Sequence, residues 1–235
     1  MHDNLSNELL DLKHFDFYNS KLIDNYIRNH LNSKDINKFE KLTIVHENSL
    51  NTLVSSNLFQ KENIDQYLKF NNNIIESDTY KFDTLDNNEI VNIFVCNQND
   101  YSILDIYSSS IMHCHQTSLL INTFIKLNIN KETSNIYINI NKSTFNIIFI
   151  KNNKIQFINT FDFNTSEDLI YYILFCLEQL ELNPEKIQTT ISGKIFKEYY
   201  DIIYKYIRNV SIYNSNLSSK SRYYNNFKNQ ILNTY

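Results

Sequence analysis

The clearest alternation of apolar and polar positions lies in the second half of the chain, from residue 134 onward. Three apolar stretches separated by short polar turns predict three consecutive antiparallel strands. The stretches are SNIYINI, TFNIIFI and KIQFINTFDF, over residues 134–140, 144–150 and 154–163. The predicted turns contain Asn141–Lys142 and Asn152–Asn153, because asparagine tolerates the left-handed backbone that tight hairpins require.

The rest of this half predicts a helix, a strand, a second helix and a last strand. The first helix starts at Thr165–Asp168, where Ser166 can cap and the acids suit the helix dipole. Apolar residues cover most of its surface as far as Asn183–Pro184, which predicts a heavily buried helix. A strand over 186–192, a helix over 195–207 and a strand over 209–213 follow. This order is the topology of one ribonuclease-H-like half of the actin and sugar-kinase superfamily.

The region before residue 130 predicts a less complete set of elements. Its predicted helices cover 18–31, 61–70, 100–107 and 115–126, and its strands cover 41–47, 51–56, 89–96 and 110–113, with a polar loop over 77–88. Only about fifteen residues precede the first helix, too few for an opening three-strand meander. We therefore expect an incomplete first half over 1–130 and a second half over 131–235, in a chain that is N-terminally shortened or starts at a downstream methionine.

Composition and charge exclude several classes of protein. The 22 basic and 26 acidic residues are dispersed, and the pI is about 5.9, whereas a dedicated nucleic-acid binder shows a basic face and a high pI. The N-terminus lacks the pattern of a signal peptide, and no stretch of about 18 apolar residues predicts a membrane span. Cys96, Cys114 and Cys176 are widely spaced in apolar stretches, as expected for reduced core thiols of a cytoplasmic protein.

Several stretches resemble domain-of-unknown-function family 3822, a bacterial family of uncharacterised proteins. The matching runs are VHENSLNTLVSSNLF, NIDQYLKFN, EDLIYYILFCLEQLELNPEKI and YKYIRNVS, over residues 45–59, 63–71, 167–187 and 204–211. The helix followed by NPE is the most specific piece, and the resemblance covers nearly everything from residue 40 on. It implies an actin-like ATPase fold, nearest to pilus-assembly and cell-division actin homologues, but no activity. Family members usually begin with a hairpin that this chain lacks.

The actin-like resemblance also implies where a nucleotide site would lie. Active relatives carry Asp-x-Gly at the end of the first strand of the second-half hairpin. There the Asp handles metal-bound water and the Gly lets backbone N–H groups approach phosphate. This chain has Asn139-Ile140-Asn141 at that place. Asparagine has no charge for a cation, and a Cβ atom at position 141 would crowd the phosphate.

The remaining nucleotide-contacting positions are reduced as well. Ser143 and Thr144 follow the altered motif and could still donate hydrogen bonds, and Gly193 would be the one glycine retained from the adenosine-side pair. The first-half phosphate hairpin is not recognisable. We therefore predict a degenerate nucleotide site, no ATP hydrolysis and no cofactor.

Other candidate chemistries are weaker. His113-Cys114-His115 has the composition of a metal cluster, but no Cys or His partner lies at a familiar spacing. We predict no metal site there, with His115 capping or packing against the following helix and Cys114 in the core. His46–Glu47 implies no nucleophile, and Glu167–Asp168 is best explained as charge at a helix N-terminus. Asp83 and Asp86 are expected to face solvent from a polar loop, and a single glycine excludes the P-loop, G-x-G-x-x-G and G-x-S-x-G.

Three functional hypotheses follow. The leading one is a non-catalytic, cytoplasmic protein of actin-like fold that binds another protein, with no membrane partner. The first alternative is an RNA-associated accessory factor, supported by basic residues near C-terminal aromatic ones: Arg208, Lys220, Arg222 and Lys228. The second is weak binding of a nucleotide or small ligand in an interdomain cleft near Asn139 and Gly193.

Overall fold

The computed structural model describes residues 2–3, 8–9, 25, 29, 42–71, 74–75, 78–85, 89–96, 111–128 and 134–213. The chain divides into two compact units, residues 14–118 and residues 119–235 together with 1–13. Of the predicted helix over 18–31, Asn25 and Asn29 are described, and both are helical. The predicted helix over 100–107, Asp86 and the segment after residue 213 lie outside the described residues.

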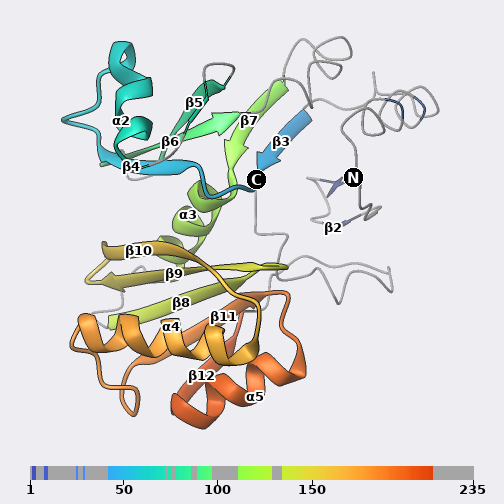
Figure 1. The fold of residues 1–235 in the computed structure, drawn as a ribbon, viewed down its shortest axis with the longest axis vertical. Coiled ribbons are helices and arrows are strands. Elements are labelled where there is room, and N and C mark those ends of the chain that lie inside the picture. Colours follow the sequence, from blue (N-terminus) through green and yellow to red (C-terminus); the bar gives the residue numbers. More distant parts are fainter. Residues whose placement is uncertain are drawn as a thin grey trace. The chain divides into compact units, whose positions relative to one another are not determined.

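The unit containing residues 119–213 is built on one five-stranded sheet with the strand order β10-β9-β8-β11-β12 (Figure 1). Its strands are β8 (Ser134–Ile140), β9 (Thr144–Lys151), β10 (Lys154–Asp162), β11 (Gln188–Gly193) and β12 (Asn209–Ile212). The first three pair antiparallel, and β11 pairs parallel with both β8 and β12. The predicted order, an antiparallel meander followed by helix, strand, helix and strand, is confirmed.

The turns of this meander follow from their asparagines. Asn152 and Asn153 both have positive φ angles, 51° and 61°, in the two-residue turn between β9 and β10, as predicted for a tight hairpin. At the turn between β8 and β9, the Asn141 N–H donates to the Thr144 carbonyl at 2.8 Å. Both turns therefore form where the sequence predicts them.

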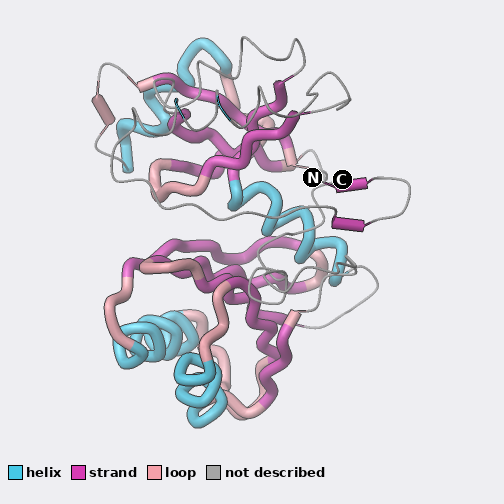
Figure 2. The backbone as a smooth tube through the Cα atoms, turned by 90° about the vertical axis from the view of Figure 1, so that its right-hand side faces the viewer, coloured by secondary structure: helices cyan, strands magenta, loops and turns pink. Residues whose placement is uncertain are grey.

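Two helices cover one face of the sheet, α4 (Ser166–Gln179) and α5 (Lys197–Tyr206) (Figure 2). One apolar cluster joins them to the sheet, and its buried members include Ile138, Ile147, Leu169, Ile173 and Ile203. The opposite face of β8 meets α3 (Gln116–Asn128), where the Phe124 and Tyr137 rings stack with centroids 4.3 Å apart. Because β8 is covered on both faces, six of its seven residues are buried.

The ends of α4 differ from the prediction. Thr165, not Ser166, is the capping residue: its hydroxyl accepts from the Asp168 N–H, and the Asp168 carboxylate accepts from the Thr165 N–H. Ser166 is buried and donates to the Glu198 carboxylate at 2.7 Å. The helix ends at Gln179, before Pro184, because Glu181 adopts a φ of 53° and the Leu182 N–H returns to the Leu177 carbonyl.

The unit containing residues 42–118 has two small sheets. One pairs β3 (Leu42–His46) in parallel with β7 (Ile111–His115). The other has the antiparallel order β4-β6-β5, from β4 (Asn51–Ser55), β6 (Ile90–Cys96) and β5 (Thr79–Thr84). A 3-10 turn, η2 (Lys61–Asn63), leads into α2 (Ile64–Asn71), whose Leu68 is buried against Val91, Ile93 and Val95. Leu68 therefore lies on the inward side of this helix.

Strand β5 corrects the predicted polar loop. Tyr80 and Phe82 alternate with polar residues, and both pack against the apolar cluster under α2. This period of two was a strand signal, which the surrounding polar residues hid. Asp83, expected to face solvent, is instead partly buried on this strand.

Near the N-terminus the structure also describes a short antiparallel pair, β1 (His2–Asp3) with β2 (Glu8–Leu9). The sequence did not predict it. The proposed boundary at residue 130 and the missing first hairpin stay predictions.

Candidate functional site

The predicted nucleotide positions converge where β8 and β11 end side by side. Asn139 lies beside Ser192 and Ile140 beside Gly193 in the parallel register of the two strands. The Ser192 hydroxyl donates to the Asn139 Oδ1 at 2.9 Å, and the Asn139 Nδ2 donates to the Asn141 Oδ1 at 3.1 Å. These side chains therefore form one network across both strands.

The network extends into the turn between β8 and β9. The Asn141 Nδ2 donates to the Thr144 hydroxyl at 3.4 Å. Ser143 is exposed, and its carbonyl accepts from the Phe163 N–H at 2.9 Å. Of the five predicted site residues, the structure brings Asn139, Asn141, Thr144 and Gly193 together, whereas the Ser143 side chain points away into solvent.

Burial and charge limit the chemistry of this cluster. Asn139 is 1% exposed, Asn141 is 3% exposed and Ser192 is fully buried. All five predicted residues are neutral, so they supply no carboxylate to hold a cation or to order its water. The two asparagine amides bind each other and their hydroxyl neighbours instead. The hydrogen bonds of this cluster connect the end of β8 to the end of β11.

The packing of the two strands explains why position 193 is a glycine, independently of any nucleotide. Its φ is 87°, and a Cβ atom there would overlap the Ile140 carbonyl oxygen and come within 2.9 Å of the carbonyl carbon. The backbone turns at this point, and the Lys194 N–H donates to the same Ile140 oxygen at 2.7 Å. The single glycine of the chain therefore stands where a side chain does not fit.

A second polar cluster lies in the other unit and was not predicted. His46 at the end of β3, Cys96 at the end of β6 and His113 on β7 bring their ligand atoms within 4.8 Å of one another. The His46 Nε2 and His113 Nδ1 are 2.9 Å apart, and the two rings stack with an interplanar angle of 14°. The Cys96 Sγ lies 3.5 Å from the first nitrogen and 3.7 Å from the second.

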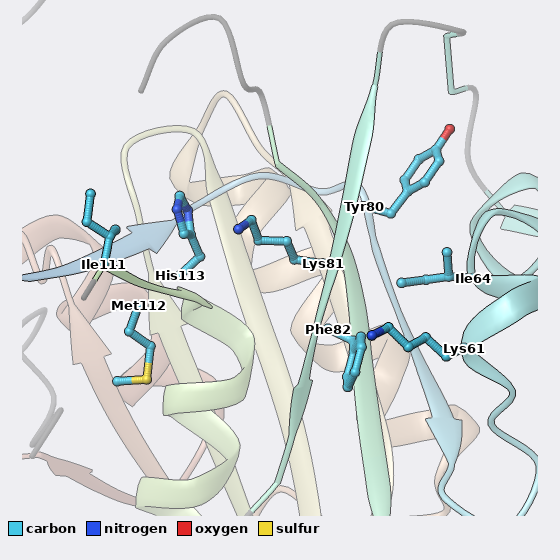
Figure 3. Close-up of a pocket in the computed structure, with 8 residues that line it drawn as sticks. All are labelled: Lys61, Ile64, Tyr80, Lys81, Phe82, Ile111, Met112 and His113. Atoms are coloured by element: carbon cyan, nitrogen blue, oxygen red, sulfur yellow. The ribbon is translucent and has the colours of Figure 1, made fainter. Parts of the chain in front are cut away.

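The surroundings of this cluster are apolar on one side and open on the other. The Phe94 ring packs against His46 with centroids 5.6 Å apart, and burial lowers the pKa of His46 to about 4, aided by the charges of His113 and Lys81. On the open side, His113 lines a pocket of about 390 Å³ together with Tyr80, Lys81 and Met112 (Figure 3). Lys81 extends into this pocket toward the His113 ring (Figure 3).

The predicted roles of His115 and Cys114 are confirmed. The His115 Nδ1 accepts from the Thr117 N–H at 3.2 Å at the start of α3, so this side chain caps the helix. Burial lowers its pKa to about 4. Cys114 is buried, and none of the three cysteines forms a disulfide. His113 instead lies next to His46 and Cys96.

Asp83 also has a structural role that the sequence did not indicate. Its carboxylate accepts from the His115 N–H at 2.8 Å. Burial raises the pKa of this carboxyl, while hydrogen bonds from Ser118 and His115 act in the opposite direction. It links β5 to the junction of β7 and α3.

Large exposed aromatic side chains lie on α4, on α5 and at the residue just before α5, and we call this set the aromatic face: Tyr171, Phe175, Phe196, Tyr204 and Tyr206. Tyr171 is 63% exposed and Tyr204 is 50% exposed. The Tyr171 ring stacks on Phe175, and Tyr204 stacks on Tyr200. The expectation that α4 is heavily buried is therefore wrong for this side of the helix.

The basic-aromatic segment proposed for RNA binding lies outside the described residues, except Arg208, which is exposed. No helix within the described ranges is long and apolar enough to cross a membrane.

Comparison with known proteins agrees with the fold. A family model, described as a protein of unknown function (DUF3822), matches residues 1–210, so the match starts about forty residues earlier than the predicted resemblance. A Bacteroides thetaiotaomicron crystal structure, described as a protein with actin-like ATPase fold and unknown function, has a TM-score of 0.79 at 21% identity. The alignment covers 90% of this chain and 84% of that one.

A second similar structure is the PilM–PilN type IV pilus biogenesis complex, with a TM-score of 0.52 at 10% identity. It covers 93% of this chain and 84% of that one. No curated protein matches the sequence. The predicted fold class, an α/β protein of actin-like fold, is confirmed by these likenesses.

Proposed function

Because the chain belongs to the DUF3822 family of actin-like fold, we propose that it is a non-catalytic member that acts in the cytoplasm by binding another protein. The observation that carries the proposal is the network around Asn139. A nucleotide-hydrolysing site needs an acid to order a metal ion and its water, and a bare backbone to approach phosphate. This chain has two asparagines there, and their side chains already bind each other, Ser192 and Thr144.

Two further observations support protein binding. One structural relative is the PilM–PilN type IV pilus biogenesis complex, an assembly of one protein with another. The aromatic face presents large exposed rings on neighbouring helices, and aromatic side chains often supply much of the binding energy at protein interfaces. Three buried cysteines, none of them in a disulfide, support a reducing compartment.

The loss of catalysis is tested by titrating the full chain with Mg²⁺-ATP in a calorimeter and measuring phosphate release. We expect no saturation below millimolar nucleotide and no phosphate release above the buffer rate. Sub-millimolar affinity with measurable turnover would show that the protein is an ATPase and would end the proposal.

Partner binding is tested with a photo-crosslinking amino acid at position 171 in the native host, and at Lys151 as an exposed control on β9. We expect a discrete adduct with another protein from position 171, absent from position 151. The adduct should disappear when Tyr204 is replaced by serine, because Tyr204 belongs to the same face. Adducts of equal yield from both positions, or an adduct with the mass of two copies of this chain, would contradict a dedicated partner at this face.

A further inference from the structure

We propose that His46, Cys96 and His113 bind a zinc-class transition-metal ion, with a fourth coordination position facing the pocket beside His113. The three side chains come from three strands of one unit, β3, β6 and β7. Two of them are buried and His113 is half-buried. This site goes beyond the proposed protein-binding function and does not depend on it.

The distances suit a tetrahedral ion. With Zn–N bonds of about 2.05 Å and Zn–S bonds of about 2.3 Å, tetrahedral angles place sulfur about 3.6 Å from each nitrogen and the nitrogens about 3.3 Å apart. The observed sulfur–nitrogen distances are 3.5 and 3.7 Å. The two nitrogens lie 2.9 Å apart, so one imidazole has to move by about 0.4 Å.

The donor atoms select the class of metal. Two imidazole nitrogens and a thiolate suit Zn²⁺, Co²⁺ or Cu, whereas Mg²⁺ and Ca²⁺ require oxygen ligands. Three protein ligands with an open position are typical of zinc sites that take water or a small ligand as the fourth. His113, one of the three ligands, also lines the pocket with Lys81 (Figure 3), and the proposal places the fourth ligand on this side of the site. The ammonium group of Lys81 favours an anionic fourth ligand over a neutral one.

The packing around the ligands holds them in place for binding. Phe94 contacts the His46 ring, and the Asn48 side chain anchors the segment after β3 by donating to the Val95 carbonyl at 3.1 Å. Cys96 and His46 belong to different sheets. A bound ion therefore links the β3–β7 sheet to the β4-β6-β5 sheet, and metal binding should stabilise this unit.

The test uses the full, tag-free chain, stripped with a chelator under reducing conditions and titrated with Co²⁺. We expect one equivalent to bind with a thiolate-to-cobalt charge-transfer band, and Zn²⁺ to displace it. Cys96→Ser should abolish the band, and His113→Ala should weaken binding by more than the roughly 10- to 100-fold that loss of an outer-sphere partner costs. Cys176→Ser, which changes another buried cysteine in the other unit, should keep both.

A second readout needs no variant that alters the fold. Zn²⁺ should protect Cys96 of the wild-type protein from alkylation, as mapped by mass spectrometry, and should raise the thermal unfolding temperature. Wild-type protein without a charge-transfer band, a band that survives Cys96→Ser, or Cys96 alkylation that Zn²⁺ does not slow would each overturn the proposal. The thiolate band also separates this site from binding by histidines elsewhere in the chain.

Discussion

Gly193 lies directly against the carbonyl group of Ile140, where the ends of β11 and β8 meet in parallel. No side chain fits between them, and the φ angle of 87° disfavours every residue with a Cβ atom. The same contact places Ser192 against Asn139. The glycine is therefore required by the packing of two strands, whether or not a nucleotide has ever bound there.

Gly193→Ala is expected to lower the free energy of unfolding by at least about 2 kcal/mol, because it adds backbone strain to a steric overlap with Ile140. Urea denaturation measures the change. Gln188→Ala, at an exposed position of the same strand, should stay within about 0.5 kcal/mol of the wild type. A glycine variant as stable as this control would show that the close approach to Ile140 is wrong.

Asn139→Asp restores the acid of the active relatives and is expected to destabilise the protein at pH 7 by about 2 kcal/mol or more. The reason is that a buried charge would replace an amide that donates to Asn141. The cost should shrink as the pH falls toward 4 and the new carboxyl is protonated. Urea denaturation across this range measures it.

The matched control is Asn159→Asp on β10, an exposed position where the same substitution should cost little. Mg²⁺-ATP should not restore the stability of Asn139→Asp. If it does, the site still accepts a metal–nucleotide complex once its acid returns, and the proposed loss of nucleotide binding would rest on Asn139 rather than on the whole site.

Asp83 should make stability depend on pH in the acid range. Burial raises the pKa of its carboxyl in the folded protein. A carboxyl of this kind favours folding when protonated, so its contribution is present below about pH 4 and is lost as the pH rises through the folded-state pKa. Asp83→Asn, which cannot ionise, should therefore gain stability relative to the wild type as the pH rises from about 4 to about 7.

Urea midpoints of the wild type and of Asp83→Asn at several pH values check this expectation. Asp162→Asn, which removes an exposed carboxyl on β10, is the control variant. A stability difference for Asp83→Asn that is constant, or that falls with rising pH, would show that burial does not dominate at this carboxyl.

Thr165→Ala should destabilise the protein by about 1 kcal/mol, because its hydroxyl accepts from the Asp168 N–H at the start of α4. Thr165→Ser keeps the accepting oxygen and should retain most of that stability. Thermal unfolding of the two variants separates the cap from general effects of substitution. Equal losses in both would mean that the methyl group of Thr165, rather than its hydroxyl, matters.

The local pattern of apolar and polar residues determined the secondary structure of the second half of this protein. Alternating isoleucines and phenylalanines of β8 and β9 and the asparagines at 152 and 153 dictate strands and turns through interactions within a few residues. The order of the meander, helix, strand, helix and strand followed from the same signals. The start of α4 was predicted less accurately, because serine and threonine are both good caps and Ser166 is instead buried, where it donates to Glu198 of α5.

The clusters of side chains differ in how far the sequence alone could predict them. The site around Asn139 and Gly193 could be placed by analogy with a known fold, although only the parallel pairing of β8 with β11 showed that its amides bind one another. Asp83 could not be assigned to the interior from a polar stretch. Its burial comes from β7 and α3, which lie far along the chain.

His46, Cys96 and His113 show the limit of sequence most clearly. They are separated by 50 and 17 residues, and no motif of fixed spacing connects them. The parallel pairing of β3 with β7 and the place of β6 in the neighbouring sheet bring them together. Pattern and propensity act over a few residues and determined the strands themselves. Which strands become neighbours depends on packing over the whole unit, so only the tertiary structure decided that these three ligands meet.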